Sequence, residues 1–276
     1  MTILFPASLD PSRDDAFSLA LDIARSLSSD IRILFVVDHD GIRRIGAGAP
    51  PGAIHMAHEA EGEIVRRESS TGAEVVAGLG QRCRDAGVPF TAGVKVGDLE
   101  EEIEKEAARC DLLVSGFASQ YDFDRQDTPG KRIISLMKER IIPILLGASP
   151  FRPVKTVVVG CGRAHHSMRA VGAMARLGLY KENCRLILLT VDDSPEEGKA
   201  RLAEPRQILK DAGYPPWEEK VLPEPKTETF PKFCEETKAD TVVLGGWGKH
   251  HWNDILVRSI TGSFLSTKRH HLFLYM

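Results

Sequence analysis

Four residues near the C-terminus have the types and spacing needed to hold a phosphate group. Gly245 and Gly248 bracket the segment Gly-Gly-Trp-Gly, which follows an apolar run, and nine residues separate Gly248 from the pair Arg258-Ser259. Glycines at a strand-to-helix turn let backbone N–H groups approach an anion, and the next helix N-terminus adds a partial positive charge. A serine hydroxyl at that helix start can donate to the same anion. The pattern predicts a phosphate site at the carboxyl end of a strand, where open α/β sheets bind ligands.

Each of these residues also has a purely structural interpretation. A glycine pair alone is a weak motif and also suits a tight strand-to-helix turn without a ligand. Arg258 could bind a phosphate as a fork of donors, or it could crowd the pocket or point to solvent. Ser259 suits an N-cap as well as a phosphate contact. The sequence leaves these alternatives open.

The elements that would position these residues occur twice. Residues 98–116 and 227–245 each read as an acidic helix, then Asp111 or Asp240, then a mostly apolar strand of four residues that is followed by glycine. The segments 2–8 and 156–162 match each other as well. In each copy, buried-strand patterns alternate with helical patterns as βαβαβαβαβ, which predicts a parallel, doubly wound sheet. Helices are expected at 131–139 and 195–212, among others, and Ser12 is expected to cap the first helix. The chain is therefore interpreted as two copies of one α/β domain.

We expect these domains at residues 1–147 and 154–276, joined by a linker at 147–153. Each copy is expected to end in an apolar edge strand, Ile142–Leu146 in the first and Leu272–Tyr275 in the second. Exposed strand edges in soluble proteins are usually paired or protected. We therefore expect these two strands to pair antiparallel across an intramolecular pseudo-twofold axis.

The second-half motif and the order of elements resemble the universal stress protein family over essentially the whole chain. The nucleotide-binding members carry Gly, two residues, Gly, nine residues, and then Gly followed by Ser or Thr. The resemblance implies a tandem pair of five-stranded parallel Rossmann-like sheets, each ordered 3-2-1-4-5, in a family that dimerises through its last strand. It also implies a role in stress tolerance and a site for an adenine nucleotide, ATP or AMP.

The second half departs from the family pattern in two places. Arg258 stands where the family has glycine, while Gly245, Gly248 and Ser259 match. The family places an aspartate against the adenosine at the end of the first strand, and in this half that place falls at Cys161 or the glycine after it. The resemblance therefore implies a degenerate nucleotide site built from Gly245, Gly248, Arg258, Ser259 and Cys161.

The first half departs further. Gly116 matches, but Ser119 replaces the second glycine, Lys131 replaces the hydroxyl residue, and Ser8 takes the place of the aspartate. The carboxylates between Ser119 and Lys131 would repel a phosphate; they are Asp122, Asp124 and Asp127. We therefore expect no nucleotide site in this half.

Composition and missing motifs narrow the function. A net charge of −3 over 276 residues argues against nucleic-acid binding, and no apolar run reaches membrane-spanning length. Five scattered cysteines and the lack of a signal peptide favour the cytoplasm. Three adjacent histidine pairs, the first members being His165, His250 and His270, fit no zinc spacing. No catalytic motif occurs, so we expect no enzyme and no metal.

The resulting hypothesis is a non-catalytic stress-response regulatory or binding module, with any nucleotide site in the second half. Its expected partners are an adenine nucleotide and its own twin domain, and a homodimer is compatible with it. The alternatives are a binder of a non-nucleotide small molecule or metal, and a weak nucleotide hydrolase.

Overall fold

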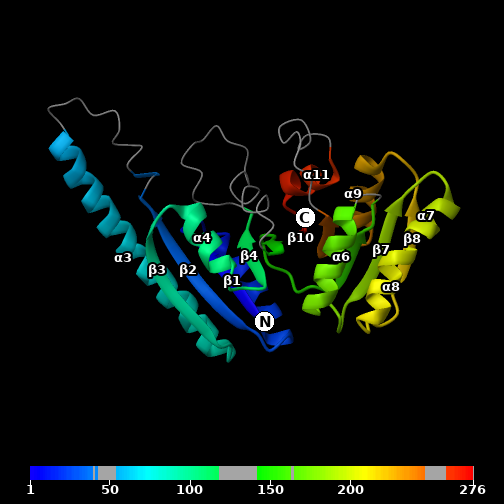
Figure 1. The fold of residues 1–276 in the computed structure, drawn as a ribbon, viewed down its shortest axis with the longest axis horizontal. Coiled ribbons are helices and arrows are strands. Elements are labelled where there is room, and N and C mark those ends of the chain that lie inside the picture. The colour runs from blue at the N-terminus through cyan, green and yellow to red at the C-terminus, as the bar shows by residue number, and fades with distance from the viewer. Residues whose placement is uncertain (40, 43–53, 118–141, 163–164, 246–258, 276) are drawn as a thin grey trace. The chain divides into compact units, whose positions relative to one another are not determined.

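The computed structural model describes residues 1–39, 41–42, 54–117, 142–162, 165–245 and 259–275 (Figure 1). The chain divides into two compact units, Met1–Leu136 and Met137–Met276. Both units combine parallel strands with packed helices, which is the α/β fold predicted from the sequence. The expected domain limits, 1–147 and 154–276, stay a prediction, and the strand that ends the first repeat lies in the second unit.

The first unit contains a parallel sheet in the order β3-β2-β1-β4. Its helices α1 and α3 contact each other, and α4 contacts the three strands β1, β2 and β3. In chain order the elements are β1 (Thr2–Ala7), α1 (Arg13–Ser26), β2 (Asp30–Asp38), α3 (Ile54–Ala86), β3 (Phe90–Gly97), α4 (Leu99–Ala107) and β4 (Leu112–Gly116).

The second unit repeats this pattern and adds one strand. Its sheet order is β5-β10-β9-β6-β7-β8, and the five strands of the second repeat are all parallel, in the predicted order. In chain order the elements are β5 (Ile144–Gly147), β6 (Thr156–Gly160), α6 (His165–Leu177), β7 (Arg185–Val191), α7 (Pro195–Arg201), α8 (Ala203–Asp211), β8 (Glu218–Leu222), α9 (Lys226–Glu236), β9 (Thr241–Gly245), α11 (Ile260–Thr267) and β10 (His271–Tyr275).

The central strands form because their sequences are nearly continuous apolar runs. Residues 157–159 of β6 are all valine and are fully buried, as are Leu4 of β1 and Val243 of β9. Strands that helices cover on both faces need such runs, since neither side meets water. In the first unit, Phe5 and Phe17 lock α1 onto β1 through an edge-to-face contact with ring centroids 4.8 Å apart.

The predicted pairing of the two repeat-ending strands is confirmed. β5 and β10 run antiparallel, with Phe273 opposite Leu145 and Leu272 opposite Leu146. All four side chains are buried. The two strands that the repeat pattern leaves without a partner on one side therefore pair with each other within the second unit.

The repeated aspartate has the same structural task in both units. Asp111 accepts a hydrogen bond from the backbone N–H of Thr2 at 2.8 Å, and Asp240 accepts one from that of Thr156 at 3.0 Å. The backbone N–H of each aspartate donates in turn to the carbonyl of the same threonine, at 2.9 Å in both units. The aspartate thus ties the start of the fourth strand of each repeat to the start of the first.

Two local expectations from the sequence are wrong in detail. The helix expected over 195–212 is broken at Leu202, because Pro205 has no N–H to donate to the carbonyl four residues earlier. Ser12 occupies the N-cap position of α1 without capping it, since its hydroxyl donates to Asp10 at 2.5 Å. The helix expected at 131–139 lies outside the described residues.

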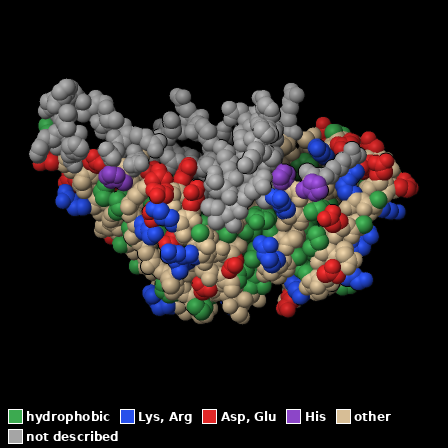
Figure 2. All heavy atoms as spheres, in the orientation of Figure 1, with side chains coloured by type: hydrophobic (Ala, Val, Ile, Leu, Met, Phe, Trp, Pro, Cys, Tyr) green, Lys and Arg blue, Asp and Glu red, His purple; other side chains and the backbone are tan. Residues whose placement is uncertain are grey.

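The surface is mixed in charge. Figure 2 shows Lys and Arg side chains interspersed with Asp and Glu on the face in view. Among the described helices, none combines the length and the apolar character needed to cross a membrane.

Candidate functional site

A cavity of about 430 Å³ opens at the carboxyl ends of β6, β7 and β9 in the second unit. The chain runs from β6 outward to β7 and β8, and then crosses to the other side of β6 to form β9 and β10. The cavity therefore lies where the direction of the winding reverses, which is where open α/β sheets bind ligands. Cys161 and Gly245, two of the residues singled out from the sequence, line it together with Ile260 and Thr261 of α11.

Cys161 provides a neutral wall at the end of β6. Its side chain is buried, and burial raises the pKa of its thiol to about 12. Its backbone N–H donates to the carbonyl of Leu189 at 2.7 Å. The residue in the place of the family's aspartate therefore brings no charge to the cavity at neutral pH.

Gly245 lies against the first turn of α6. A Cβ atom at this position would meet the backbone carbon of His166 at 2.4 Å and the backbone nitrogen of Ser167 at 2.5 Å. Backbone atoms cannot move away as a flexible side-chain tip can. The need for glycine here is therefore explained by the close approach of α6, whether or not a ligand binds.

Arg201 forms the wall at the end of β7. Its Nη1 donates to the hydroxyl of Thr190 at 3.2 Å and to the carbonyl of Val191 at 3.1 Å, and its Nη2 forms an ion pair with Asp192. The side chains of Arg201 and Asp192 are only 15% and 6% exposed. One guanidinium thus occupies acceptors that the end of β7 would otherwise offer to a ligand.

The last helix adds its N-terminus to the opposite wall. Ser259 is the N-cap of α11, and its side-chain oxygen accepts a hydrogen bond from the backbone N–H of Gly262 at 3.0 Å. The N-cap interpretation of Ser259 therefore holds locally. Gly248 and Arg258 lie outside the described residues, so their proposed roles stay predictions.

The rim carries charges of both signs. Glu224 and Lys226 are exposed residues at the start of α9, and the backbone N–H of Lys226 donates to the Glu224 carboxylate at 2.7 Å. On the other side, the hydroxyl of Ser167 donates to the carbonyl of Gly162 at 3.0 Å. The described wall thus combines an apolar floor of strand residues with a few polar groups, which is typical of small-molecule pockets.

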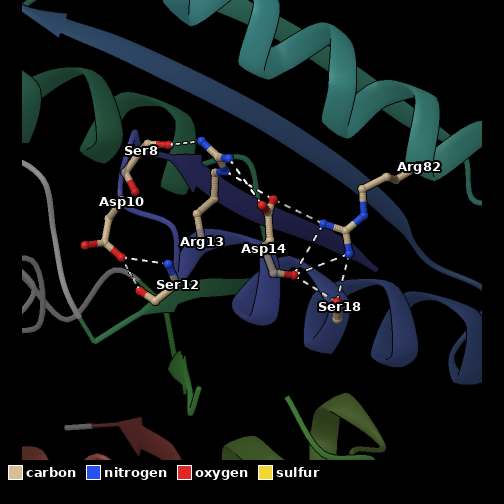
Figure 3. A network of polar contacts seen from close by, with 7 residues as sticks. All are labelled: Ser8, Asp10, Ser12, Arg13, Asp14, Ser18 and Arg82. Atoms are coloured by element: carbon tan, nitrogen blue, oxygen red, sulfur yellow. Dashed lines mark hydrogen bonds and ion pairs between the residues drawn. The ribbon is translucent and has the colours of Figure 1, made fainter. Parts of the chain in front are cut away.

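In the first unit, a network of polar contacts joins the segment after β1 to the start of α1 and to α3 (Figure 3). Arg13 donates to the carbonyl of Ser8 at 2.6 Å, and Asp10 accepts from the backbone N–H of Ser12 at 2.8 Å. Arg82 reaches across from α3 to Asp14 and Ser18. At the place of the family's aspartate, the carbonyl of Ser8 is therefore bound by a guanidinium from the next helix. Ser119, Lys131 and the aspartates between them lie outside the described residues, whereas Gly116 ends β4 and is buried.

The described histidines and cysteines do not gather around a metal. Within the described ranges, no group of three or more His, Cys, Asp or Glu side chains is placed to hold a metal ion. His270 and His271, at the start of β10, are buried and do not line the cavity, and His250 lies outside the described residues. All five cysteines are free thiols, four of them buried.

Sequence reasoning missed Arg201. The residue carries no motif, and the residues it binds precede it in the chain by about ten positions. Only the fold brings the end of α7 back over the end of β7. Its partners gave no signal either. Thr190 and Val191 belong to β7 itself, and a polar residue directly after a buried strand, here Asp192, is common.

Comparisons with known proteins address the fold. No protein-family model matches the sequence, and no curated protein matches it. A solved universal stress protein from Archaeoglobus fulgidus is 15% identical, with a TM-score of 0.72, and the match covers 99% of this chain and 97% of that one. A protein from Pseudomonas aeruginosa, named as a universal stress protein, is 15% identical, with a TM-score of 0.62 over 99% of this chain and 92% of that one.

A third similar structure is part of a cotransporter and is not named as a universal stress protein. The cytoplasmic domain of a prokaryotic cation chloride cotransporter is 11% identical, with a TM-score of 0.57 over 100% of this chain and 95% of that one. One fold thus occurs in proteins with different names, so function must be argued from the site. What the whole-length matches establish is the architecture: the chain has the universal stress protein fold from end to end.

Proposed function

We propose that this protein is a non-catalytic regulatory module that binds a small molecule in the cavity of its second unit. The observation that supports the proposal is the position and size of that cavity. It lies at the winding reversal of the sheet, and its volume of about 430 Å³ is within the usual range for small-molecule sites, roughly 300–1,000 Å³.

The ligand class that we propose is an adenine nucleotide, ATP or AMP. Its phosphates would lie toward the N-terminus of α11, where unsatisfied backbone N–H groups favour an anion. Gly248 and Ser259 would contact the phosphates, Arg258 would take up room beside them, and Cys161 would face the nucleoside. The universal stress protein fold supports this class by analogy alone, and the glycine at 245 does not add to it, because packing already explains that residue.

We also propose that the first unit does not bind a nucleotide. The contact of Arg13 with Ser8 supports this, since the guanidinium occupies the backbone carbonyl at the place of the family's aspartate. The carboxylates at Asp122, Asp124 and Asp127 would add repulsion. Binding of one nucleotide per chain, in the second unit, is the consequence.

A second candidate is a small molecule that is not a nucleotide. Two observations favour it: the end of β7 has its acceptors occupied by Arg201, and Cys161 offers a neutral thiol in place of a carboxylate. A ligand that presents hydrogen-bond acceptors to this wall would suit it better than one that presents donors. Metal binding and weak nucleotide hydrolysis are the remaining alternatives.

Native mass spectrometry of the freshly purified full chain distinguishes a nucleotide from another small molecule as the ligand. A single added mass equal to AMP or ATP supports the nucleotide, and one of another small molecule supports the second candidate. If the chain carries no added mass, and binds neither AMP nor ATP when each is supplied at millimolar concentration, the nucleotide proposal is wrong. Two equivalent nucleotides per chain would contradict the proposed difference between the units.

We also propose the cellular location and the partners of the protein from the amino-acid composition of its chain. Scattered thiols and a net charge of −3 fit a cytoplasmic protein that binds neither nucleic acid nor membrane, and a homodimer is compatible with the fold. Size-exclusion chromatography with light scattering would establish the oligomeric state.

A further inference from the structure

His271, the first residue of β10, holds the loop that leads from β5 to β6. This loop, residues 148–155, is called here the β5–β6 loop. The backbone N–H of Ala148 donates to Nδ1 of His271 at 2.9 Å, and Nε2 of the same ring lies 3.0 Å from the carbonyl of Arg152. Both ring nitrogens therefore bind backbone groups of one loop, at its first and fifth residues.

The donors and acceptors fix the form of this ring. An amide N–H can only donate, so Nδ1 of His271 must accept and cannot carry a proton. A carbonyl can only accept, so Nε2 must carry the proton and donate to Arg152. The two bonds together require the neutral Nε2–H tautomer. A second proton has to go to Nδ1, where it would face the N–H of Ala148.

The neighbouring His270 has the opposite arrangement. Its Nδ1 lies 2.6 Å from the carbonyl of Ala239, so this nitrogen must carry a proton and donate. A second proton on His270 would go to Nε2 and leave the contact with Ala239 in place. The two adjacent histidines thus differ in what protonation does: it removes a hydrogen bond at His271 and keeps one at His270.

The surroundings disfavour the charged form of His271 in the closed loop. Its side chain is almost fully buried, and burial lowers the pKa of the imidazole. The hydrogen bond to the Arg152 carbonyl and the charge of Asp240 oppose this lowering of the pKa, while the charges of Arg152 and His270 add to it. β5 and β9, which flank β10, carry no titratable side chain. Helix α6 also contacts β10, and its titratable residues are His165, His166, Arg169 and Arg176.

The loop has other attachments besides His271. Arg152 donates to the carbonyl of Arg269 at 2.7 Å, and Asp240 accepts from the backbone N–H groups of Lys155 and Thr156. Ala148 lies directly after β5, whose partner is β10. The His271 contact therefore fastens the β5 end of the loop, and protonation of Nδ1 removes it.

We propose that His271 is an acid-sensitive latch: in its neutral form it fastens the β5–β6 loop to β10, and when it gains a proton the Ala148 end of the loop opens. Opening exposes the end of β5 and weakens its pairing with β10 at that point. The device belongs to the pairing of the two repeat-ending strands and is independent of the ligand cavity.

The size of the pH effect on loop opening follows from the thermodynamic linkage between opening and protonation of His271. An opened loop leaves His271 in water, where it gains a proton near pH 6.5, while the closed loop resists protonation. The opening equilibrium therefore rises as the pH falls below about 6.5, by up to tenfold for each pH unit. Between pH 7.5 and 5.5 we expect the protection of the Ala148 amide against hydrogen exchange, corrected for intrinsic rates, to fall roughly three- to tenfold.

Hydrogen exchange of the full chain, read by NMR or by mass spectrometry at single-residue resolution, tests the proposal. His271→Asn keeps an acceptor for Ala148 without a titrating ring, so its Ala148 protection should not depend on pH in this range. His270→Asn is the matched control and should keep the parent's acid response. The parent alone decides the case if the variants fold poorly: equal protection at both pH values, or a ring whose Nδ1 carries the proton at pH 7.5 by ¹⁵N shifts, would overturn the latch.

Discussion

The backbone of His166 passes so close to Gly245 that any side chain at position 245 would collide with it. The distance from an added Cβ to the His166 carbonyl carbon is 2.4 Å, and the contact joins the end of β9 to the first turn of α6. A residue that looks like part of a phosphate loop thus has a packing reason to be glycine. Loss of binding in a variant at this position would not identify a ligand contact.

Gly245→Ala should therefore destabilise the second unit with or without a ligand. We expect a loss of about 1–3 kcal/mol, the usual cost of overpacking. Urea unfolding of the ligand-free protein measures it. Gly162→Ala is the control, because an added Cβ there has its nearest neighbour, the Ser167 hydroxyl, at 4.0 Å. Equal stabilities of the two variants would contradict the packing explanation.

Ser259 can be separated into its two roles by a pair of variants. Ser259→Ala removes the acceptor for Gly262 and should cost about 0.5–2 kcal/mol of stability, while Ser259→Asp keeps an N-cap acceptor and should cost little. If the proposed phosphate contact exists, Ser259→Asp should still weaken ATP binding, because a carboxylate repels the phosphate. Unfolding and calorimetry on the same samples distinguish the roles. An aspartate variant that binds ATP as the parent does would remove Ser259 from the site.

Arg201 and Asp192 should behave as a coupled pair. Arg201→Ala leaves the Asp192 carboxylate, which is 6% exposed, without the guanidinium beside it, and breaking such a buried pair costs about 3–5 kcal/mol. Asp192→Asn, added to Arg201→Ala, should recover part of that loss because no buried charge remains. A double-mutant cycle in urea measures the coupling. Additive losses would show that the ion pair does not matter for stability.

Arg258 gives a direct test of the phosphate loop. We predict that it obstructs the site, because a side chain takes the room that glycine leaves for a ligand. Arg258→Gly should then tighten ATP binding relative to the parent. If Arg258 instead clamps a phosphate, the same change should weaken binding roughly ten- to a hundredfold, the equivalent of about 1.5–3 kcal/mol. Calorimetric titration of both proteins with ATP decides between the two.

The fold could be predicted because the sequence patterns that specify it are either local or present in both repeats. Apolar strand runs such as Val157–Val159 and the recurring aspartates at 111 and 240 define the parallel units, and the two leftover edges predict the β5–β10 pairing. The site could be predicted only in part. The approach of α6 to Gly245 and the return of Arg201 to the end of β7 depend on how helices pack on the sheet, which no local pattern records. Pro205 does carry a local signal against a single helix over 195–212, because proline has no N–H to donate.

The central claim is that the cavity of the second unit is the ligand site, and blocking it tests the claim most directly. Gly162 lines the cavity and has open space around it, so Gly162→Phe should fill the cavity without unfolding the unit. Gly93→Phe, on exposed β3 of the first unit, is the matched control. Calorimetric titration with AMP and ATP should give one site per chain in the parent and in Gly93→Phe, and no binding in Gly162→Phe. Unchanged nucleotide binding by a folded Gly162→Phe protein would contradict the account.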